Sequence, residues 1–521
     1  MTRPTPQRPA NPSATPSPGQ WISTTYVVLI ALLMTCTGWM ALREASTRYM
    51  LPFQRADVVA YTQQGAQALR ADPTPEKLNQ YSNELGLLAM WTSPQRFIDS
   101  KLIEHGLYLS QMPKLNQVLL TSHIFLGVFC MLFGGFQFWP AFRKRFMRVH
   151  RLIGAGYVVT APISVLLSFA YMAVTPPHHL YTHMTSYVAL WLFGTVAITS
   201  VGMAVRALMQ KRIHEHMAYM ALSFACLLVA PMLRWNWVGL AWLFPAIDQE
   251  TLNIVTMGIM LPECLLIGYG LILANRQYGR AMTKRPLAVV AQHASNLFQR
   301  MTPALYLAAT GFMAINVMHY VLGNGISSAS AASQLVNAAL LEREASILSQ
   351  NPGLGSVFGV SISLACLLAI YVFTQLLKQP VQAASRIPSS ARLLVLLSLT
   401  AGVSATTLGW QMGLAPNQQW LSGGTLYTVG GMLIVLFALV LTVAQIKKHH
   451  AMMKESLAFL LALLPFSALF FINLWVMQWL PIPADYIAQG QAYILSAGAS
   501  TALLFVTLYY VVYGQATREH G

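Results

Sequence analysis

Apolar runs of about 20 residues recur along the chain and alternate with polar connections; the first extends from Trp21 to Leu42. A helix of about 20 apolar residues spans the hydrocarbon layer of a bilayer, and in lipid only helices and closed barrels satisfy their own backbone hydrogen bonds. Charged residues make up 9% of the chain, whereas soluble proteins carry about 25%. The chain is therefore predicted to be an all-α, polytopic membrane protein, with the lipid bilayer as its surroundings.

About 12 transmembrane helices are predicted, in two six-helix sets that occupy residues 21–274 and 303–513. The predicted spans are 21–42, 116–140, 150–174, 184–208, 216–242 and 251–274 in the first set, and 303–323, 354–377, 391–413, 424–446, 454–479 and 488–513 in the second. Three cytoplasmic segments complete the chain: a disordered tail rich in Pro, Thr and Ser (1–20), a linker (275–302) and a C-terminal tail (514–521).

The two sets resemble an internal repeat. Each opens with one span and a long external loop, 43–115 in the first set and 324–353 in the second. The segment KRIHEHMAYMALSFACLLVAP resembles IKKHHAMMKESLAFLLALLP, and both place a histidine the same distance before a proline. An even number of spans per set makes the two halves parallel. Helical spacing in 43–115 also predicts short amphipathic helices that cover the outer mouth of the bundle.

The net charge of +16 follows from where the basic residues lie. They fill alternate connections, with Arg143, Lys144, Arg145, Arg148 and Arg151 in one, Arg206, Lys211 and Arg212 in another, and Arg276, Arg280, Lys284 and Arg285 in a third. This is the positive-inside pattern of membrane proteins. It predicts a bacterial inner-membrane protein with both termini in the cytoplasm, and it excludes a nucleic-acid partner as the reason for the charge.

Four consecutive spans of the histidine-bearing core, 116–242, each carry a histidine near one end: His123, His150, His183 and His216. In antiparallel helices His123 and His183 lie near the outer face of the bilayer, and His150 and His216 near the inner face. Each histidine begins a helical stripe of mostly small residues. The second half lacks counterparts of His123, His150, His183 and Arg234, so we expect the chemistry in the first half and a scaffold or docking role for the second.

Histidines beside small residues can hold a flat macrocycle, because haem iron accepts imidazole nitrogen and bulky neighbours would block the ring. The sequence thus predicts haem b, with His123, His150, His183 and His216 as hypothetical ligands of the haem iron. Small residues in membrane helices also serve close packing, and that interpretation stays open, with interfacial histidines. His178 and His179 lie beside His183, and three interpretations stay open: they replace it as ligand, bind metal weakly, or do neither.

Two charged residues lie within or near the predicted spans, where a charge costs about 2.5–3.5 kcal/mol and usually marks function. Arg234 is expected at the depth of His123 and His183, either paired with a haem propionate or reaching the headgroups. Glu263 follows Pro262 in the sixth span. It is a candidate proton-relay group, a lining residue of an ion path, a partner of Arg234, or a protonated packing residue.

The segments SHIFLGVFCMLFGGFQF, FRKRFMRVHRLIGAGYV and HEHMAYMALSFACLLVAPMLRW, within 118–240, resemble a bacterial membrane family known only as a domain of unknown function. The alternating histidines also resemble those of transmembrane di-haem b-type cytochromes. That second resemblance implies that His123 and His183 hold an outer haem, and that His150 and His216 hold an inner one. His150, His183 and His216 lie closer to their helix ends than the ligands of those cytochromes.

Three functions are compatible with these features. The first is electron transfer through b-type haem, to or from a quinone or an external acceptor, as in a membrane oxidoreductase. Tyr157 and Tyr187 would then be neighbours of the histidine ligands. The second is proton-coupled transport of a small solute between the two halves, with Glu263 and Arg234 lining the path. The third is a membrane assembly or sensor protein whose external loop binds a partner.

Overall fold

The computed structural model describes residues 18–50, 54–85, 94–99, 102–176, 179–180, 183–243, 249–276, 287–336, 338–378, 389–413 and 424–484, with Ile487 and Thr507. Every regular element in these ranges is helical, so the predicted all-α fold class is confirmed. The predicted N-terminal tail overlaps the first helix by its last three residues, because that helix begins at Pro18.

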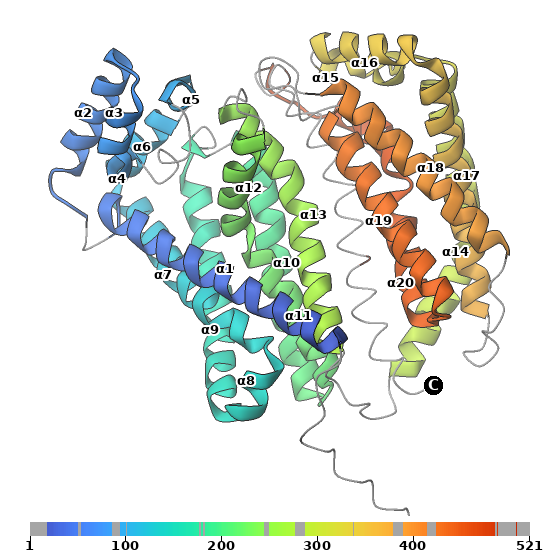
Figure 1. Cartoon of the computed structure of the whole chain (residues 1–521), viewed down its shortest axis with the longest axis horizontal. Helices are drawn as coiled ribbons and strands as arrows, with labels where there is room; N and C mark the ends of the chain where they lie inside the picture. Colours follow the sequence, from blue (N-terminus) through green and yellow to red (C-terminus); the bar gives the residue numbers. More distant parts are fainter. Residues whose placement is uncertain are drawn as a thin grey trace, which may run out of the picture.

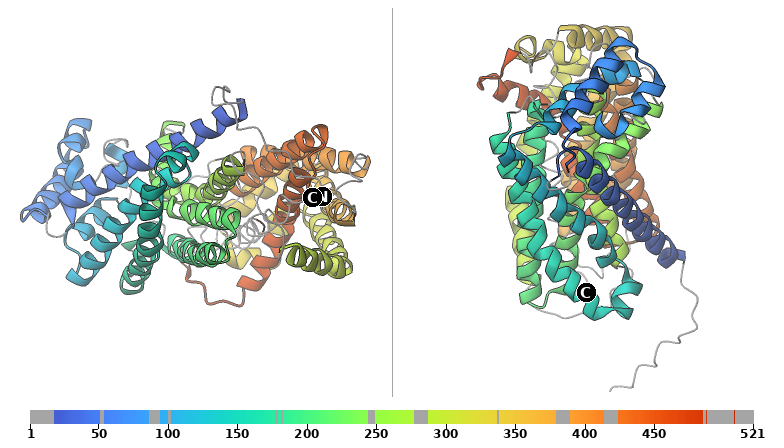
Figure 2. Two further views of the ribbon diagram at one scale, coloured as in Figure 1. Left: turned by 90° about the horizontal axis from the view of Figure 1, so that it is seen from below. Right: turned by 90° about the vertical axis from the view of Figure 1, so that its left-hand side faces the viewer.

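Two helical bundles stand side by side (Figure 1 and Figure 2, left). The first holds α1 (Pro18–Arg48), α7 (Lys114–Gln137), α9 (Met147–Val174), α10 (His183–Met209), α11 (Ile213–Leu227), α12 (Val229–Leu243) and α13 (Gln249–Arg276), with the short α8 (Pro140–Arg145) between α7 and α9. The second holds α14 (Leu287–Asn316), α17 (Pro352–Lys378), α18 (Ser389–Met412), α19 (Leu426–Ile446), α20 (His450–Leu463) and α21 (Phe466–Met477). Because α14 begins inside the predicted linker, 275–302, the second half of that linker is helical.

Nine helices in the described ranges are long and apolar enough to cross a membrane. They number up to ten when α11 and α12, which meet at a bend of 51°, are taken as one span. The predicted span 216–242 is therefore broken in the middle, at Leu228. The predicted span 488–513 lies outside the described residues, apart from Thr507. Several membrane-spanning helices are thus shown, while twelve spans and the repeat stay predictions.

One turn recurs in both halves and bears on the predicted repeat. Lys211, between α10 and α11, and Lys448, between α19 and α20, both have positive φ, at 58° and 51°. The backbone hydrogen bonds around the two turns also match: Arg212 N–H donates to the Ala207 carbonyl and His449 N–H to the Ala444 carbonyl, each over 2.8 Å. These positions are offset by three residues from the match of histidine-to-proline intervals. At this hairpin the halves are alike, in a register shifted by three residues.

The predicted outer loop contains the expected short helices. These are α2 (Val58–Ala71), α3 (Pro75–Gln80), α4 (Ser82–Leu85), α5 (Pro94–Asp99) and α6 (Leu102–Ser110). Their apolar faces form a small separate core that includes Leu69, Leu78 and Phe97, each exposed by 2% or less. In the second half, η4 (Gly325–Ser328), α15 (Ala332–Leu335) and α16 (Ala338–Gln350) lie at the same end of the molecule as α2–α6 (Figure 1).

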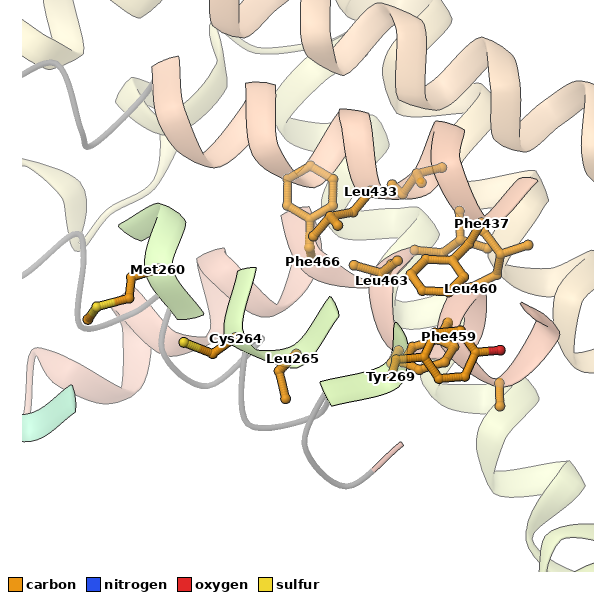
Figure 3. Close-up of a cluster of buried hydrophobic side chains, with 14 of the residues drawn as sticks. Met260, Cys264, Leu265, Tyr269, Leu433, Phe437, Phe459, Leu460, Leu463 and Phe466 are labelled. Atoms are coloured by element: carbon orange, nitrogen blue, oxygen red, sulfur yellow. The ribbon is translucent and has the colours of Figure 1, made fainter. Parts of the chain in front are cut away.

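The two halves meet where α13 faces α19 and α20 (Figure 3). The ring of Tyr269 packs edge-on against Phe459, with centroids 5.1 Å apart, and Phe459 stacks on Phe437 at 4.2 Å. The Tyr269 hydroxyl donates a hydrogen bond to Oε2 of Glu455 over 2.8 Å. Because Glu455 is only 1% exposed, this bond supplies a partner for a buried carboxyl in an otherwise apolar contact.

Within the second bundle, α18 and α19 touch backbone to backbone. A Cβ placed on Gly402 would lie 2.8 Å from the carbonyl oxygen of Gly431, and one on Gly409 would lie 2.5 Å from that of Gly424. The two glycines are seven residues apart on each helix, so they share a face. Small residues at such a crossing let the two helices approach closely. In lipid, this close packing holds helices together, because the hydrophobic effect does not act between them.

We expect Gly431→Ala to separate α18 from α19. Its Cβ would meet the Gly402 carbonyl at 2.5 Å and the Thr406 nitrogen at 2.7 Å, and overpacking of this kind costs about 1–3 kcal/mol. The neighbouring Gly430→Ala is the control, because its Cβ would meet only the Phe466 ring, at 3.5 Å. Thermal unfolding in detergent should show a lower midpoint for Gly431→Ala alone. Equal midpoints would show that the two helices do not touch here.

Candidate functional site

The histidine-bearing helices form a ring. α7 packs on α9, α9 on α10, α10 on α11, and α11 returns to α7. Helices α7 and α10 therefore lie across the ring from each other, as do α9 and α11. The predicted outer pair, His123 and His183, comes from the first diagonal. The predicted inner pair, His150 and His216, comes from the second.

In the outer pair, the His123 ring is held by α9. Its Nδ1 lies 2.8 Å from the Ser164 carbonyl oxygen, and the Ser164 hydroxyl donates to the His123 carbonyl over 2.9 Å. A carbonyl only accepts, so Nδ1 carries the proton and Nε2 is left as an acceptor. His183 is the first residue of α10. Its side chain lies outside the described residues, so the outer pairing stays a prediction.

In the inner pair, His150 and His216 lie close enough to interact electrostatically with each other and with Arg143. The His216 Nδ1 lies 3.0 Å from the Ala204 carbonyl oxygen, which again leaves Nε2 as the acceptor. Arg143 is fixed by a contact of 3.1 Å from Nη1 to Met217 Sδ. The structure therefore places two histidines of facing helices and one guanidinium in the same neighbourhood, at one end of the ring.

Unsatisfied polar atoms gather around the inner pair. Gln137 Nε2, His150 Nδ1, Arg212 Nε and Glu215 Oε1 are all buried without a hydrogen-bond partner among the described residues. Gln137 lies against α9 one turn from His150, because a Cβ on Gly154 would be 3.3 Å from its Oε1. Buried polar atoms in folded proteins are nearly always bonded to protein, water or ligand. Four such atoms lie at this end of the bundle, where water or a polar ligand would complete their hydrogen bonds.

Gln137 and Glu215 are the site residues that the histidine pattern missed. Glu215 is 1% exposed and receives a bond of 2.5 Å from Arg212 Nη1. Glu215 lies between two histidines in the sequence and Gln137 lies in the Gly-Gly-Phe-Gln-Phe segment. Each is a polar residue at the end of an apolar run, and this position is the sequence feature that identifies it.

Side chains fill the middle of the ring. This bears on whether the small residues there serve helix packing or make space for a flat ligand. A Cβ on Gly134 would lie 2.6 Å from the Phe224 ring, and one on Gly194 would lie 2.5 Å from the Phe169 ring. The hydroxyls of Tyr157 and Ser223 bond across the centre, from α9 to α11, over 3.2 Å. These small residues serve packing, so the middle of the ring has no room for a flat ligand.

Arg234 lies at the end of the first bundle near α6, which the sequence predicts to be the outer end. It donates to the Ala230 carbonyl over 2.9 Å and is near enough to His105 of α6 to affect its charge. Burial, and then the Arg48 guanidinium, lower the pKa of His105 to about 3, so this imidazole is neutral at physiological pH. Beside it, the His179 ring stacks on Tyr108 with centroids 4.0 Å apart. The outer end is thus basic and partly covered by α6.

The carboxyl of Glu263 pairs with Asn236, whose Nδ2 donates to Oε2 over 2.6 Å. The proposed pairing of Glu263 with Arg234 is not seen, because Asn236 from α12 occupies that position. Tyr187 lies toward the outer end, with its ring centroid 6.2 Å from that of Trp191. No group of three or more metal-ligating side chains occurs in the described ranges, and a pair of axial imidazoles does not require one.

A family model described as "Predicted membrane protein (DUF2306)" matches residues 120–270. The match runs from α7 into α13 and contains every predicted site residue: His123, His150, His183, His216, Arg234 and Glu263. No curated protein and no solved structure matches the chain. The comparison therefore identifies the first bundle as similar to a family of membrane proteins, with no activity attached.

Proposed function

We propose that the first bundle is a b-type haem protein that transfers electrons in the membrane, with one haem held by His150 and His216. The observation that carries the proposal is that these two histidines come from facing helices and lie near enough to interact electrostatically, and that the Nδ1 proton of His216 is donated to a backbone carbonyl. Histidines that bind a metal are usually oriented in this way, and the bond leaves Nε2 for the metal.

The residues around the pair fit the chemistry of the group. Arg143 offers positive charge to the carboxylates of a haem edge, and Gln137 Nε2 offers an unused N–H. A haem with two axial imidazoles supplies one-electron transfer. The Ala204 carbonyl holds His216 in one tautomer, and Arg143 would balance the charge of the carboxylates. The packed side chains of Phe224 and Tyr157 keep water out of the middle of the ring.

A second haem at the outer end is part of the same proposal. His123, with its Nδ1 proton held by Ser164, would be one ligand and His183 the other. Arg234 is then the partner of a propionate. Electrons would pass between the two ends and a quinone or an external acceptor, which makes the protein a component of a membrane oxidoreductase.

We also propose the orientation of the protein in a bacterial inner membrane. The basic residues Arg143, Lys144 and Arg145 lie in α8, at the opposite end of the molecule from α2–α6 and α16 (Figure 1). By the positive-inside rule the α8 end faces the cytoplasm. The N- and C-termini lie on that side under this proposal, and the inner histidine pair lies close to it.

The proposal is tested by the absorption spectrum of the full-length protein, expressed with added haem precursor and purified in detergent. We expect a dithionite-reduced minus oxidised spectrum with the sharp α and Soret bands of six-coordinate haem b. Protein that is folded but lacks these bands would contradict the proposal. Proton-coupled solute uptake by vesicles of the same haem-free protein, lost in Glu263→Gln, would instead support transport.

A further inference from the structure

The second bundle, which the sequence predicts to be a scaffold, contains a buried hydrogen-bonded carboxyl. Glu344 of α16 is 1% exposed. Its Oε1 accepts a hydrogen bond from the Tyr427 hydroxyl of α19 over 2.9 Å. The Tyr427 hydroxyl also bonds to the Tyr320 hydroxyl, so one carboxyl and two phenols form a chain from α16 into the bundle.

The local backbone is shaped to admit this carboxyl. Tyr320 lies in a π-helical turn, Val317–Val321, that follows α14, and such turns occur often at functional sites. Gly325 then adopts a positive φ of 67°, and a Cβ there would lie only 2.5 Å from Glu344 Oε1. Glycine at 325 therefore provides both the turn and the space for the carboxyl.

Glu344 also occupies an unusual position in its own helix. Leu340, Glu344 and Leu348 are spaced by four residues and are all buried, so they form the stripe that docks α16 on the bundle. An acid in the middle of such an apolar stripe is costly to bury when ionised. A purely structural helix would carry an apolar residue there.

The surroundings offer no compensating cation among the described residues. The titratable groups that face the carboxyl are Tyr427 from α19 and Tyr320 from the π-helical turn. His319 of the same turn bonds instead to the Ser328 hydroxyl over 2.6 Å and stacks on Phe471. On α16 itself, Glu342 is exposed and Arg343 lies near Gly413 of α18. Oε2 of Glu344 has no hydrogen-bond partner in this part of the chain.

We propose that Glu344 is a proton-binding site of the second bundle, and that the bound proton keeps α16 docked. On release, the carboxyl O–H bond breaks, the proton passes to water, and an uncompensated carboxylate remains under α16. That charge is relieved when α16 lifts and the carboxylate becomes hydrated. The proposal is independent of haem in the first bundle.

The pH window follows from the burial. Burial raises the pKa of Glu344 from 4.5 to about 8 in the docked state, whereas the hydrated, undocked carboxyl keeps its ordinary pKa. The docked state thus binds the proton more tightly. Docking is strongest below about pH 4.5, weakens as pH rises toward 8, and is constant above that, where both states are ionised.

The test is hydrogen–deuterium exchange of α16 in the full-length protein at pH 5, 6.5 and 8.5, corrected for the intrinsic chemical rate. We expect the corrected exchange of α16 to rise at least about tenfold across this range. Glu344→Gln, which keeps an acceptor for Tyr427, should abolish the rise. Glu342→Gln is the matched control on the same helix and should exchange like the wild type.

Tyr427→Phe provides a second measurement. The Tyr427 hydroxyl stabilises the carboxylate by donating to it, so its removal should extend the rise in exchange to higher pH. A wild-type α16 whose exchange does not depend on pH would overturn the proposal. A rise that persists in Glu344→Gln would also overturn it, because another group would then be responsible.

Discussion

We expect His150→Ala and His216→Ala each to remove the proposed inner haem, and with it the share of the reduced α and Soret bands that belongs to that haem. The physical reason is that a six-coordinate b haem is held by two axial bonds, and the loss of either imidazole leaves a weakly bound group that is lost on purification. The haem-to-protein ratio of each purified variant is the measurement. We expect each single variant to lose as much haem as the double variant.

Two other histidines serve as controls for this result. His319→Ala changes a buried histidine of the second bundle that stacks on Phe471 and should keep the full haem content. His123→Ala should remove only the outer haem, leaving the inner one. If His150→Ala and His216→Ala keep the wild-type ratio while His123→Ala loses all haem, the inner site is wrong and only the outer one survives.

The second large effect concerns a buried ion pair within α1, at the end of that helix that lies beside α6. Arg48 is 2% exposed, and its Nη1 lies 2.7 Å from Oε1 of Glu44 one turn earlier. Glu44→Ala leaves the guanidinium buried without this carboxylate, and removing one partner of a buried pair costs about 3–5 kcal/mol. We expect a fall of this size in the free energy of unfolding. Denaturant titration of the purified protein measures it.

An exposed ion pair in the same region gives the matched control. Arg70 and Glu104 pair at 2.6 Å with their side chains 50% and 58% exposed, and exposed pairs contribute about 0–1 kcal/mol. Glu104→Ala should therefore change stability little. Glu44→Ala combined with Arg48→Ala should recover part of the loss, because no buried charge remains. Equal effects of Glu44→Ala and Glu104→Ala would mean that the Glu44 carboxylate does not compensate Arg48.

The sequence predicts the membrane class because about 20 consecutive apolar residues have few other uses. It also places histidines near helix ends, since helical rise converts sequence position into depth. The break at Leu228 between α11 and α12 was missed, because the apolar run continues through it and Pro231, three residues later, was taken as part of one span. Pro231 has no N–H to donate to the carbonyl of Leu227, four residues earlier, and this lost helical bond accounts for a bend of 51° at this point.

The contacts of the candidate residues depended on geometry that spacing alone does not give. Whether His150 meets His216 is set by the ring order of α7, α9, α10 and α11. The contact between Phe224 and Gly134 was equally hidden. A small residue predicts that another group approaches closely, but it does not identify that group. Glu344 was visible as an acid spaced by four residues between Leu340 and Leu348. Its importance emerges only when Tyr427, 83 residues later, lies against it.

The central claim is that His150 and His216 bind one haem iron together. Electron paramagnetic resonance of the oxidised full-length protein tests it most directly, because two axial imidazoles give low-spin ferric iron. We predict a low-spin signal in wild type that persists in His123→Ala, and its loss or conversion to a high-spin signal in His216→Ala. A signal unchanged in His216→Ala and absent in His123→Ala, or no ferric haem signal in folded wild-type protein, would contradict the account.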